Sequence, residues 1–172
     1  MSGTAMLVRE ATEKDFDRMM EIYALAREFM ARQGNPHQWG DGAWPPPELI
    51  RQDIGSSHSY VCEADGRVVG TFYFVVGPDI EPTYRVIEGG AWLDGSPYGV
   101  IHRLAGDGSI RGIARFCLNW AYGQCGHLRV DTTAENALMI KILQESGFVR
   151  CGVIRVARDG SARLAFERPD RS

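Results

Sequence analysis

The segment from Leu104 to Ala114 combines residue types that bind anions with the spacing of a strand-to-helix turn. An apolar stretch ends there, glycines interrupt the chain, and a second apolar stretch begins. The first amides of a helix have no partners within it, and its N-terminus carries a partial positive charge. Glycines let a ligand approach the backbone, and Arg111 adds a positive charge. The segment therefore predicts a phosphate or pyrophosphate site, although a plain tight turn would use the same glycines.

A dinucleotide-binding fold is one interpretation of this segment. Gly106, Gly108 and Gly112 give G-x-G-x-x-x-G, which is one residue longer than the dinucleotide fingerprint. Asp131 stands where that fingerprint places its acidic residue, at the end of the next predicted strand. However, about 100 residues precede the glycines, and too little chain follows for a second set of βαβ units. The dinucleotide interpretation therefore fits this chain poorly.

Residues 98–148 resemble the acyl-CoA-binding core of the GNAT superfamily of N-acetyltransferases. The family's phosphate loop reads [Q/R]-x-x-G-x-[G/A], and this chain matches it at Gly112 and Ala114, with Ser109 in place of Gln or Arg. The stretch 102–105 resembles the family's fourth strand. Asn136, followed eleven residues later by Gly147-Phe148, resembles the family's N…GF signature.

The resemblance implies acetyl-CoA, or a related acyl-CoA, as the cofactor. The backbone of Leu104 and Ala105 would pair with the pantetheine arm in a splay between strands four and five, and Asn136 would hydrogen-bond that arm. The backbone amides of 111–114 would hold the pyrophosphate, and the expected cofactor-binding residues of this loop are Ser109, Ile110, Arg111, Gly112, Ile113 and Ala114.

Acyl transfer to an amine requires removal of a proton, a donor for the oxyanion and a route for the departing thiolate. The resemblance implies direct attack in a ternary complex, with the Leu104 amide as oxyanion donor. Many family members carry a Tyr as thiolate acid where this chain has Leu143. A thiol with a pKa of about 8.5 also leaves unprotonated, so the missing acid does not exclude catalysis.

His102 is the first candidate for the base. Strand alternation places it on the same face as Leu104, and histidine changes charge near neutral pH. It could equally be a packed core histidine. Tyr73 and Glu88 are weaker candidates for the base or for acceptor contacts.

The acceptor wall is expected in the Trp- and Pro-rich loop after the first helix. Gln38, Trp39 and Trp44 could line a pocket there, or the tryptophans could simply cover an edge of the core. The acidic segment 77–97 is expected on the same side.

The predicted elements place these residues around one mixed sheet. Thr12 is a helix N-cap, Asp65-Gly66 is a hairpin turn, and Thr132 with Glu135 has the spacing of a capping box. Strand–helix–strand around 98–132 requires a parallel crossover, whereas the hairpins require antiparallel pairing. The fold class is α+β (α/β mixed): a mostly antiparallel, six- to seven-stranded sheet with about four helices on both faces. The expected strands are 6–9, 59–64, 67–76, 98–105, 128–131, 148–156 and 162–167, and the expected helices are 12–30, 48–54, 109–124 and 132–146. Residues 77–97 are expected to form a loop, with or without a short helix near 84–88.

Length and composition favour one domain over residues 1–172. The chain is 44% hydrophobic and 24% charged, which excludes wholesale disorder. No apolar run reaches the roughly 18 residues of a membrane span, and no basic stripe predicts nucleic-acid binding. The four cysteines form no CxxC pair and no zinc spacing, so no metal is expected. We expect a cytoplasmic protein without a membrane partner.

The net charge of −3 hides two unequal parts. Residues 1–97 carry 8 Lys and Arg against 15 Asp and Glu, whereas residues 98–172 carry 11 against 7. The division matches the expected acceptor half, 6–97, and acyl-CoA half, 98–167. The acidic half favours a cationic acceptor.

The sequence therefore predicts an acetyl-CoA-dependent N-acetyltransferase that acts on a primary amine of a small, cationic or amino-acid-like substrate. The alternatives are a protein or peptide N-acetyltransferase and a non-catalytic acyl-CoA-binding sensor. An exposed edge strand would make a homodimer plausible.

Overall fold

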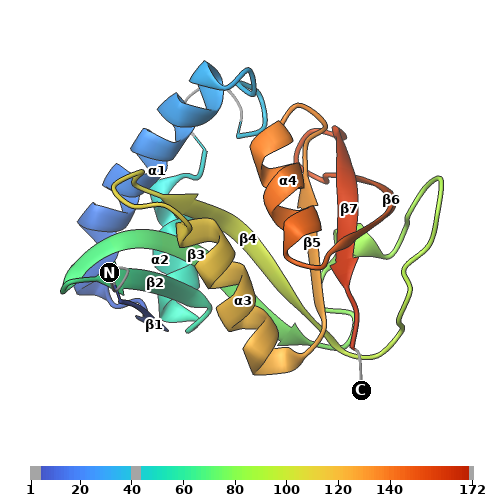
Figure 1. The fold of residues 1–172 in the computed structure, drawn as a ribbon, viewed down its shortest axis with the longest axis horizontal. Coiled ribbons are helices and arrows are strands. Elements are labelled where there is room, and N and C mark those ends of the chain that lie inside the picture. The colour runs from blue at the N-terminus through green and yellow to red at the C-terminus, as the bar shows by residue number, and fades with distance from the viewer. Residues whose placement is uncertain (1–4, 40–43, 171–172) are drawn as a thin grey trace.

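A seven-stranded sheet in the order β1-β2-β3-β4-β5-β7-β6 forms the centre of the protein (Figure 1). The computed structural model describes residues 5–39 and 44–170. Neighbouring strands pair antiparallel except β4 and β5, which are parallel, as the mixed fold class predicted. In chain order the elements are β1 (Met6–Glu10), the 3-10 helix η1 (Glu13–Asp15), α1 (Phe16–Arg32), α2 (Pro47–Gly55), β2 (Ser59–Ala64), β3 (Arg67–Gly77), the 3-10 helix η2 (Pro82–Tyr84), β4 (Tyr98–Gly106), α3 (Ile113–Cys125), β5 (Leu128–Thr132), α4 (Ala137–Glu145), β6 (Val149–Arg155) and β7 (Ala162–Arg168).

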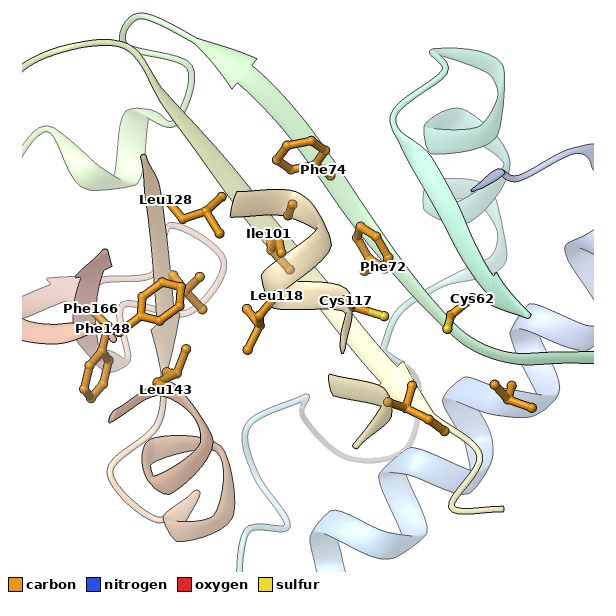
Figure 2. Close-up of a cluster of buried hydrophobic side chains, with 14 of the residues drawn as sticks. Cys62, Phe72, Phe74, Ile101, Cys117, Leu118, Leu128, Leu143, Phe148 and Phe166 are labelled. Atoms are coloured by element: carbon orange, nitrogen blue, oxygen red, sulfur yellow. The ribbon is translucent and has the colours of Figure 1, made fainter. Parts of the chain in front are cut away.

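Helices α1 and α2 cover one face of the sheet, and α3 and α4 cover the other. Val61 and Cys62 are neighbours in β2 and belong to opposite apolar clusters, as strand alternation requires. The cluster under the first pair of helices includes Met19, Ile22, Tyr23 and Ile50. The cluster under the second pair, drawn in Figure 2, includes Phe72, Ile101, Cys117, Leu118, Leu143, Phe148 and Phe166.

A bulge in β4 changes the direction of its side chains. Tyr73 pairs with His102 and Thr71 with Ala105, so two residues of β4 oppose one residue of β3. Arg103 occupies this bulge with φ +53, in the left-handed region. The expected alternation of His102 and Leu104 is therefore wrong. His102 and Ala105 share one face, whereas Leu104 packs against the cluster under α3.

Helices α3 and α4 begin later than their sequences predicted. The expected start of α3 at 109 is wrong because Gly112 adopts φ +85 and caps the helix, which begins at Ile113. The expected capping box at Thr132 is also wrong, because Thr132 remains in β5 opposite Leu164. Asn136 caps α4 instead, with its side chain accepting a hydrogen bond from the Met139 amide.

The long segment between β3 and β4 is anchored by a buried carboxylate. Glu167 of β7 is fully buried and accepts hydrogen bonds from the Leu93 amide at 2.6 Å and from Arg129 Nε at 2.9 Å. Its second oxygen also lies 2.7 Å from His127 Nε2. The short helix considered near 84–88 is replaced by η2, and Glu88 forms a backbone bridge with Val153. These contacts hold 77–97 against β7 and β6.

Within the two described ranges, no helix is both long enough and apolar enough to cross a membrane.

Candidate active site

A cavity of about 930 Å³ opens where β4 and β5 diverge. The two strands pair only at Gly99 with Leu128 and at Val100 with Arg129, and then separate (Figure 1). Beyond those pairs the cavity is lined by β4 from 101 to 106 and by β5 from 130 to 132. Helices α1, α3 and α4, the loops that follow α1 and precede α3, and Arg163 of β7 contribute the remaining walls. The expected splay between strands four and five therefore exists and is hollow.

The N-terminus of α3 forms one end of the cavity. Its first helical hydrogen bond runs from the Phe116 amide to the Gly112 carbonyl, so the amides of 113–115 have no partner within the helix. All six residues of the predicted phosphate loop except Ser109 line the cavity. The exposed Arg111 is among them and adds a cation at the helix end. This is a site with the charge and the free donors that an anion requires.

A side-chain latch holds the loop that enters α3. Asp107 Oδ1 accepts hydrogen bonds from the Ser109 amide at 2.9 Å and from its hydroxyl at 2.6 Å. Asp107 Oδ2 accepts from Arg18 Nη2 at 2.6 Å. Since Arg18 compensates this nearly buried carboxylate, Asp107 shapes the loop without leaving an unpaired negative charge beside the anion site. Ser109 thus stabilises the turn through its hydrogen bonds to Asp107.

Asn136 lines the cavity from the start of α4. Its side-chain oxygen caps the helix, and its Nδ2 donates to Gln38 Oε1 at 3.1 Å. Gln38 Oε1 also accepts from the hydroxyls of Thr132 and Thr133. Gln38 therefore joins the loop after α1 to the ends of β5 and α4. The contact of Asn136 with a cofactor stays a prediction.

His102 lies in the cavity wall between two carboxylates. Its Nε2 is 2.7 Å from Glu81 Oε2, and its Nδ1 is 4.0 Å from Asp131 Oδ2. Burial alone would raise the pKa of Glu81, but the hydrogen bonds and charge from His102 and Thr83 outweigh it, so this pKa lies below its usual value. An ionised carboxylate only accepts hydrogen bonds, so Nε2 must carry the proton. In the neutral ring, Nδ1 then presents a lone pair.

Asp131 presents the second carboxylate to the cavity. Tyr84 donates a hydrogen bond to its Oδ2 at 2.6 Å, and Arg163 Nη1 lies 3.6 Å from its Oδ1. Complete burial, with the charge of Asp131, raises the pKa of Tyr84 well above its usual value. Tyr84 therefore stays a donor that orients Asp131 beside His102.

The predicted acceptor residues divide into two groups. Gln38 and Trp39 line the cavity, and the buried Trp39 packs edge-on against Tyr23 of α1. Among the described residues, the cavity lining does not include the other three, which are Trp44, Tyr73 and Glu88.

Each of these three has a different partner. Arg158 stacks over the Trp44 ring at 4.2 Å, and the exposed Glu88 carboxylate lies 3.4 Å from Arg155. Tyr73 stacks on the ring of His102, with centroids 5.8 Å apart. Of the three, Tyr73 contacts a cavity residue directly.

Sequence reasoning missed Glu81, Arg163 and the part that Asp131 plays beside His102. Glu81 belonged to a segment recognised as acidic, but no pattern showed which of its carboxylates would meet β4. Asp131 was visible as a strand-end acid. Arg163 carries no local signal, because its position at the cavity follows from the pairing of β7 with β5.

No family model and no curated protein matches this sequence. Solved structures do match the fold. An acetyltransferase of the GNAT family from Streptococcus agalactiae shares 27% identity, with a TM-score of 0.86 over 97% of this chain and 96% of that one. A ribosomal-protein-alanine N-acetyltransferase from Brucella melitensis shares 20% identity, with a TM-score of 0.64 over 94% and 98%.

The acetyltransferase YncA from Salmonella typhimurium, solved with its cofactor acetyl-CoA, shares 17% identity, with a TM-score of 0.64 over 98% of this chain and 96% of that one. The likenesses to the Brucella and Salmonella proteins concern the fold alone. The likeness to the Streptococcus agalactiae acetyltransferase, together with the splayed β4 and β5 and the capped turn into α3, places this chain in the GNAT superfamily of acetyltransferases.

Proposed function

We propose that this protein is an N-acetyltransferase that uses acetyl-CoA and acetylates a primary amine of a small, cationic or amino-acid-like substrate. The observation that carries the proposal is the single cavity wall formed by β4. It leads from the N-terminal amides of α3 at one end to His102 at the other, where Nδ1 lies 4.0 Å from Asp131 Oδ2. Acyl transfer from a CoA thioester to an amine requires a site for the CoA phosphates and a base for the amine, and this wall carries candidates for both.

The residues at the α3 end fit a CoA pyrophosphate. A Cβ built at Gly108 or Gly112 meets nothing within 4 Å, so the turn leaves open space beside the helix N-terminus. The amides of 113–115 and the side chain of Arg111 would bind the phosphates. The backbone of Leu104 and Ala105 and the side chain of Asn136 would contact the pantetheine arm. When bound, acetyl-CoA supplies an activated acetyl thioester.

His102 would act as the base. Its Nδ1 would accept a proton from the acceptor ammonium, and Glu81 would stabilise the resulting imidazolium through the 2.7 Å contact with Nε2. Asp131 would hold the ammonium near Nδ1 before the proton leaves. Each of these groups is fixed by a neighbour in the free protein, so little reorganisation accompanies the step.

The amide of Leu104, at the β4 bulge, would donate to the developing oxyanion. Leu143, where many family members carry a Tyr, is fully buried with Phe148 and Phe166 (Figure 2). Among the described residues, the cavity lining includes no tyrosine. We therefore propose that the thiolate leaves unprotonated or takes its proton from water.

The way in which the acceptor half, 6–97, and the acyl-CoA half, 98–167, share the cavity supports a small acceptor. Residues 98–167 supply the predicted CoA contacts, while Gln38 and Trp39 of the 6–97 half line the same cavity. A partly closed wall suits a small molecule better than a protein terminus. The carboxylate of Asp131 favours an acceptor that carries a positive charge.

The test is an acetyl-CoA thermal shift followed by an amine panel. We expect acetyl-CoA to raise the melting temperature and free CoA thiol to accumulate with small amines. Binding without transfer to any amine would favour the sensor alternative and contradict the enzyme. Transfer to peptides but not to free amines would favour the protein N-acetyltransferase.

A further inference from the structure

The cavity wall opposite β4 carries an arginine whose charge is poorly compensated. Arg163 of β7 lines the cavity with a side chain that is only 8% exposed. Its closest anionic partner is Asp131, whose Oδ1 lies 3.6 Å from Nη1, beyond ordinary hydrogen-bond length. A buried charge is usually both paired and hydrogen-bonded, so this arrangement needs an explanation.

The hydrogen bonds of Arg163 confirm that its guanidinium is under-satisfied. Nη2 donates to the Gln38 carbonyl at 2.7 Å. Nε is buried and, within the described ranges, has no hydrogen-bond partner. Burial lowers the pKa of Arg163, which reflects the cost of holding this cation out of water.

Two arginines close to Arg163 are better compensated than it is, and Arg111, which also lines the cavity, belongs to the anion site at α3. Arg103 also lines the cavity, but its Nη2 donates to Asp53 at 2.6 Å and its Nε to the same oxygen at 3.1 Å. Arg158 donates to the same Gln38 carbonyl as Arg163, at 3.0 Å, yet it stacks on Trp44 and does not belong to the cavity lining. Arg163 therefore combines a place in the cavity wall with spare donor capacity at Nη1, whose nearest carboxylate oxygen is 3.6 Å away.

Guanidinium groups recognise carboxylates through paired hydrogen bonds. Asp131, beside Arg163 and 4.0 Å from His102 Nδ1, is suited to an ammonium. A cation and an anion side by side in one wall complement a zwitterion whose amino and carboxyl groups are close together.

We propose that the acceptor is a free α-amino acid, with its carboxylate bound by Arg163 and its amino group held by Asp131 beside His102. This inference rests on the proposed acetyltransferase function and narrows its substrate class. Arg163 is then a specificity-determining residue that the acceptor carboxylate would satisfy.

The experiment compares free L-amino acids with their α-carboxamides as acceptors. The two differ in charge at one group and keep the same side chain and amine. We expect the wild type to prefer the acids. Arg163→Gln should reduce kcat/KM for the best acid by about 10- to 100-fold, mainly through KM, and should change the carboxamide far less. Arg158→Gln is the matched control and should keep the preference for acids, because Arg158 contacts Gln38 but not the cavity.

Arg163→Lys keeps the positive charge without the paired donors, and we expect it to keep part of the preference. Melting temperature and acetyl-CoA affinity are measured for every variant, so a folding defect in Arg163→Gln is seen directly. If Arg163→Gln does not fold, the preference for acids over carboxamides in the wild type and in Arg163→Lys still tests the inference.

Two outcomes separate this inference from the proposed function. Equal use of acids and carboxamides by the wild type, or an equal loss for both in Arg163→Gln, overturns this inference and leaves the proposed function standing. Transfer to no amine at all overturns the proposed function, and the amino-acid acceptor with it.

Discussion

The neighbours of His102 determine which ring nitrogen carries the proton and how the ring is oriented. Glu81 fixes the proton on Nε2, Tyr73 stacks on the ring, and Tyr84 orients the Asp131 carboxylate that Nδ1 approaches. These partners come from the segment after β3, from β3 itself and from β5. A histidine serving only the core would not need an ionised partner on one nitrogen and an open cavity beside the other.

We expect His102→Ala to reduce kcat by about 10²- to 10⁴-fold, the usual range for a general base. Acetyl-CoA affinity should change little, because the phosphate site lies at the other end of β4. Steady-state kinetics and isothermal titration with acetyl-CoA measure the two effects.

His102→Gln is the matched control for this variant. Gln can still donate to Glu81 but cannot accept a proton at neutral pH, so its kcat should stay low. Wild-type turnover that does not change between about pH 6 and pH 9 would contradict a histidine base.

At the scale of elements, the turn into α3 does more than connect two secondary structures. Gly112 sits at φ +85, a conformation that costs an L-residue about 1–2 kcal/mol. That geometry aims the first amides of α3 into the cavity. The predicted helix start at 109 missed it because Ser109 and Ile110 have helix-compatible side chains, whereas the Asp107 latch that removes them from the helix is visible only in three dimensions.

Gly112→Ala should weaken acetyl-CoA binding by about 5- to 10-fold, because an alanine strained at this position would shift the first amides of α3. Gly66→Ala, in the β2–β3 turn, is the control. It has φ +75 and nothing within 4 Å of a built Cβ, so it carries a similar backbone penalty far from the cavity.

Both variants should lose similar stability, and titration calorimetry should find the affinity loss only in Gly112→Ala. Equal affinities for the two would argue against phosphate binding at α3.

The order of elements was predictable because the chain's local patterns agree with its tertiary contacts. Asp65-Gly66, with both residues at positive φ, forms the expected two-residue turn between β2 and β3. The β4 bulge was not predictable. It depends on Arg103 accepting a left-handed conformation, and a buried ion pair with Asp53 of α2 holds its side chain there.

Across the whole molecule, the site depends on a segment that has little regular structure of its own. Residues 77–97 bring Glu81 and Tyr84 to β4, and the buried Glu167 fastens this segment to β7. Long-range placement of this kind explains why sequence reasoning located the anion site, which is local, but not the partners of His102.

Glu167→Ala should lower the free energy of unfolding by about 3–5 kcal/mol, since it leaves Arg129 and His127 without their buried anion. Activity should fall as well, because Glu81 loses its support. Urea denaturation measures the stability loss.

Glu13→Ala removes an exposed carboxylate that pairs with Arg51 at 3.3 Å, and it should cost no more than about 1 kcal/mol. A similar loss in both variants would mean that the Glu167 cluster is not a structural anchor.

The splay between β4 and β5 leaves an unpaired strand edge inside the sheet. An unpaired strand edge normally recruits other chains, and proteins usually blunt such edges at the perimeter of a sheet. Here β4 has an open edge in the middle of the sheet, with β5 and α4 standing across from it. A slender ligand can reach its backbone groups from the cavity, whereas a second polypeptide has no outer rim there on which to extend the sheet. The open edge of β4 is thus placed where a ligand can pair with it and where sheet extension by another chain is sterically disfavoured.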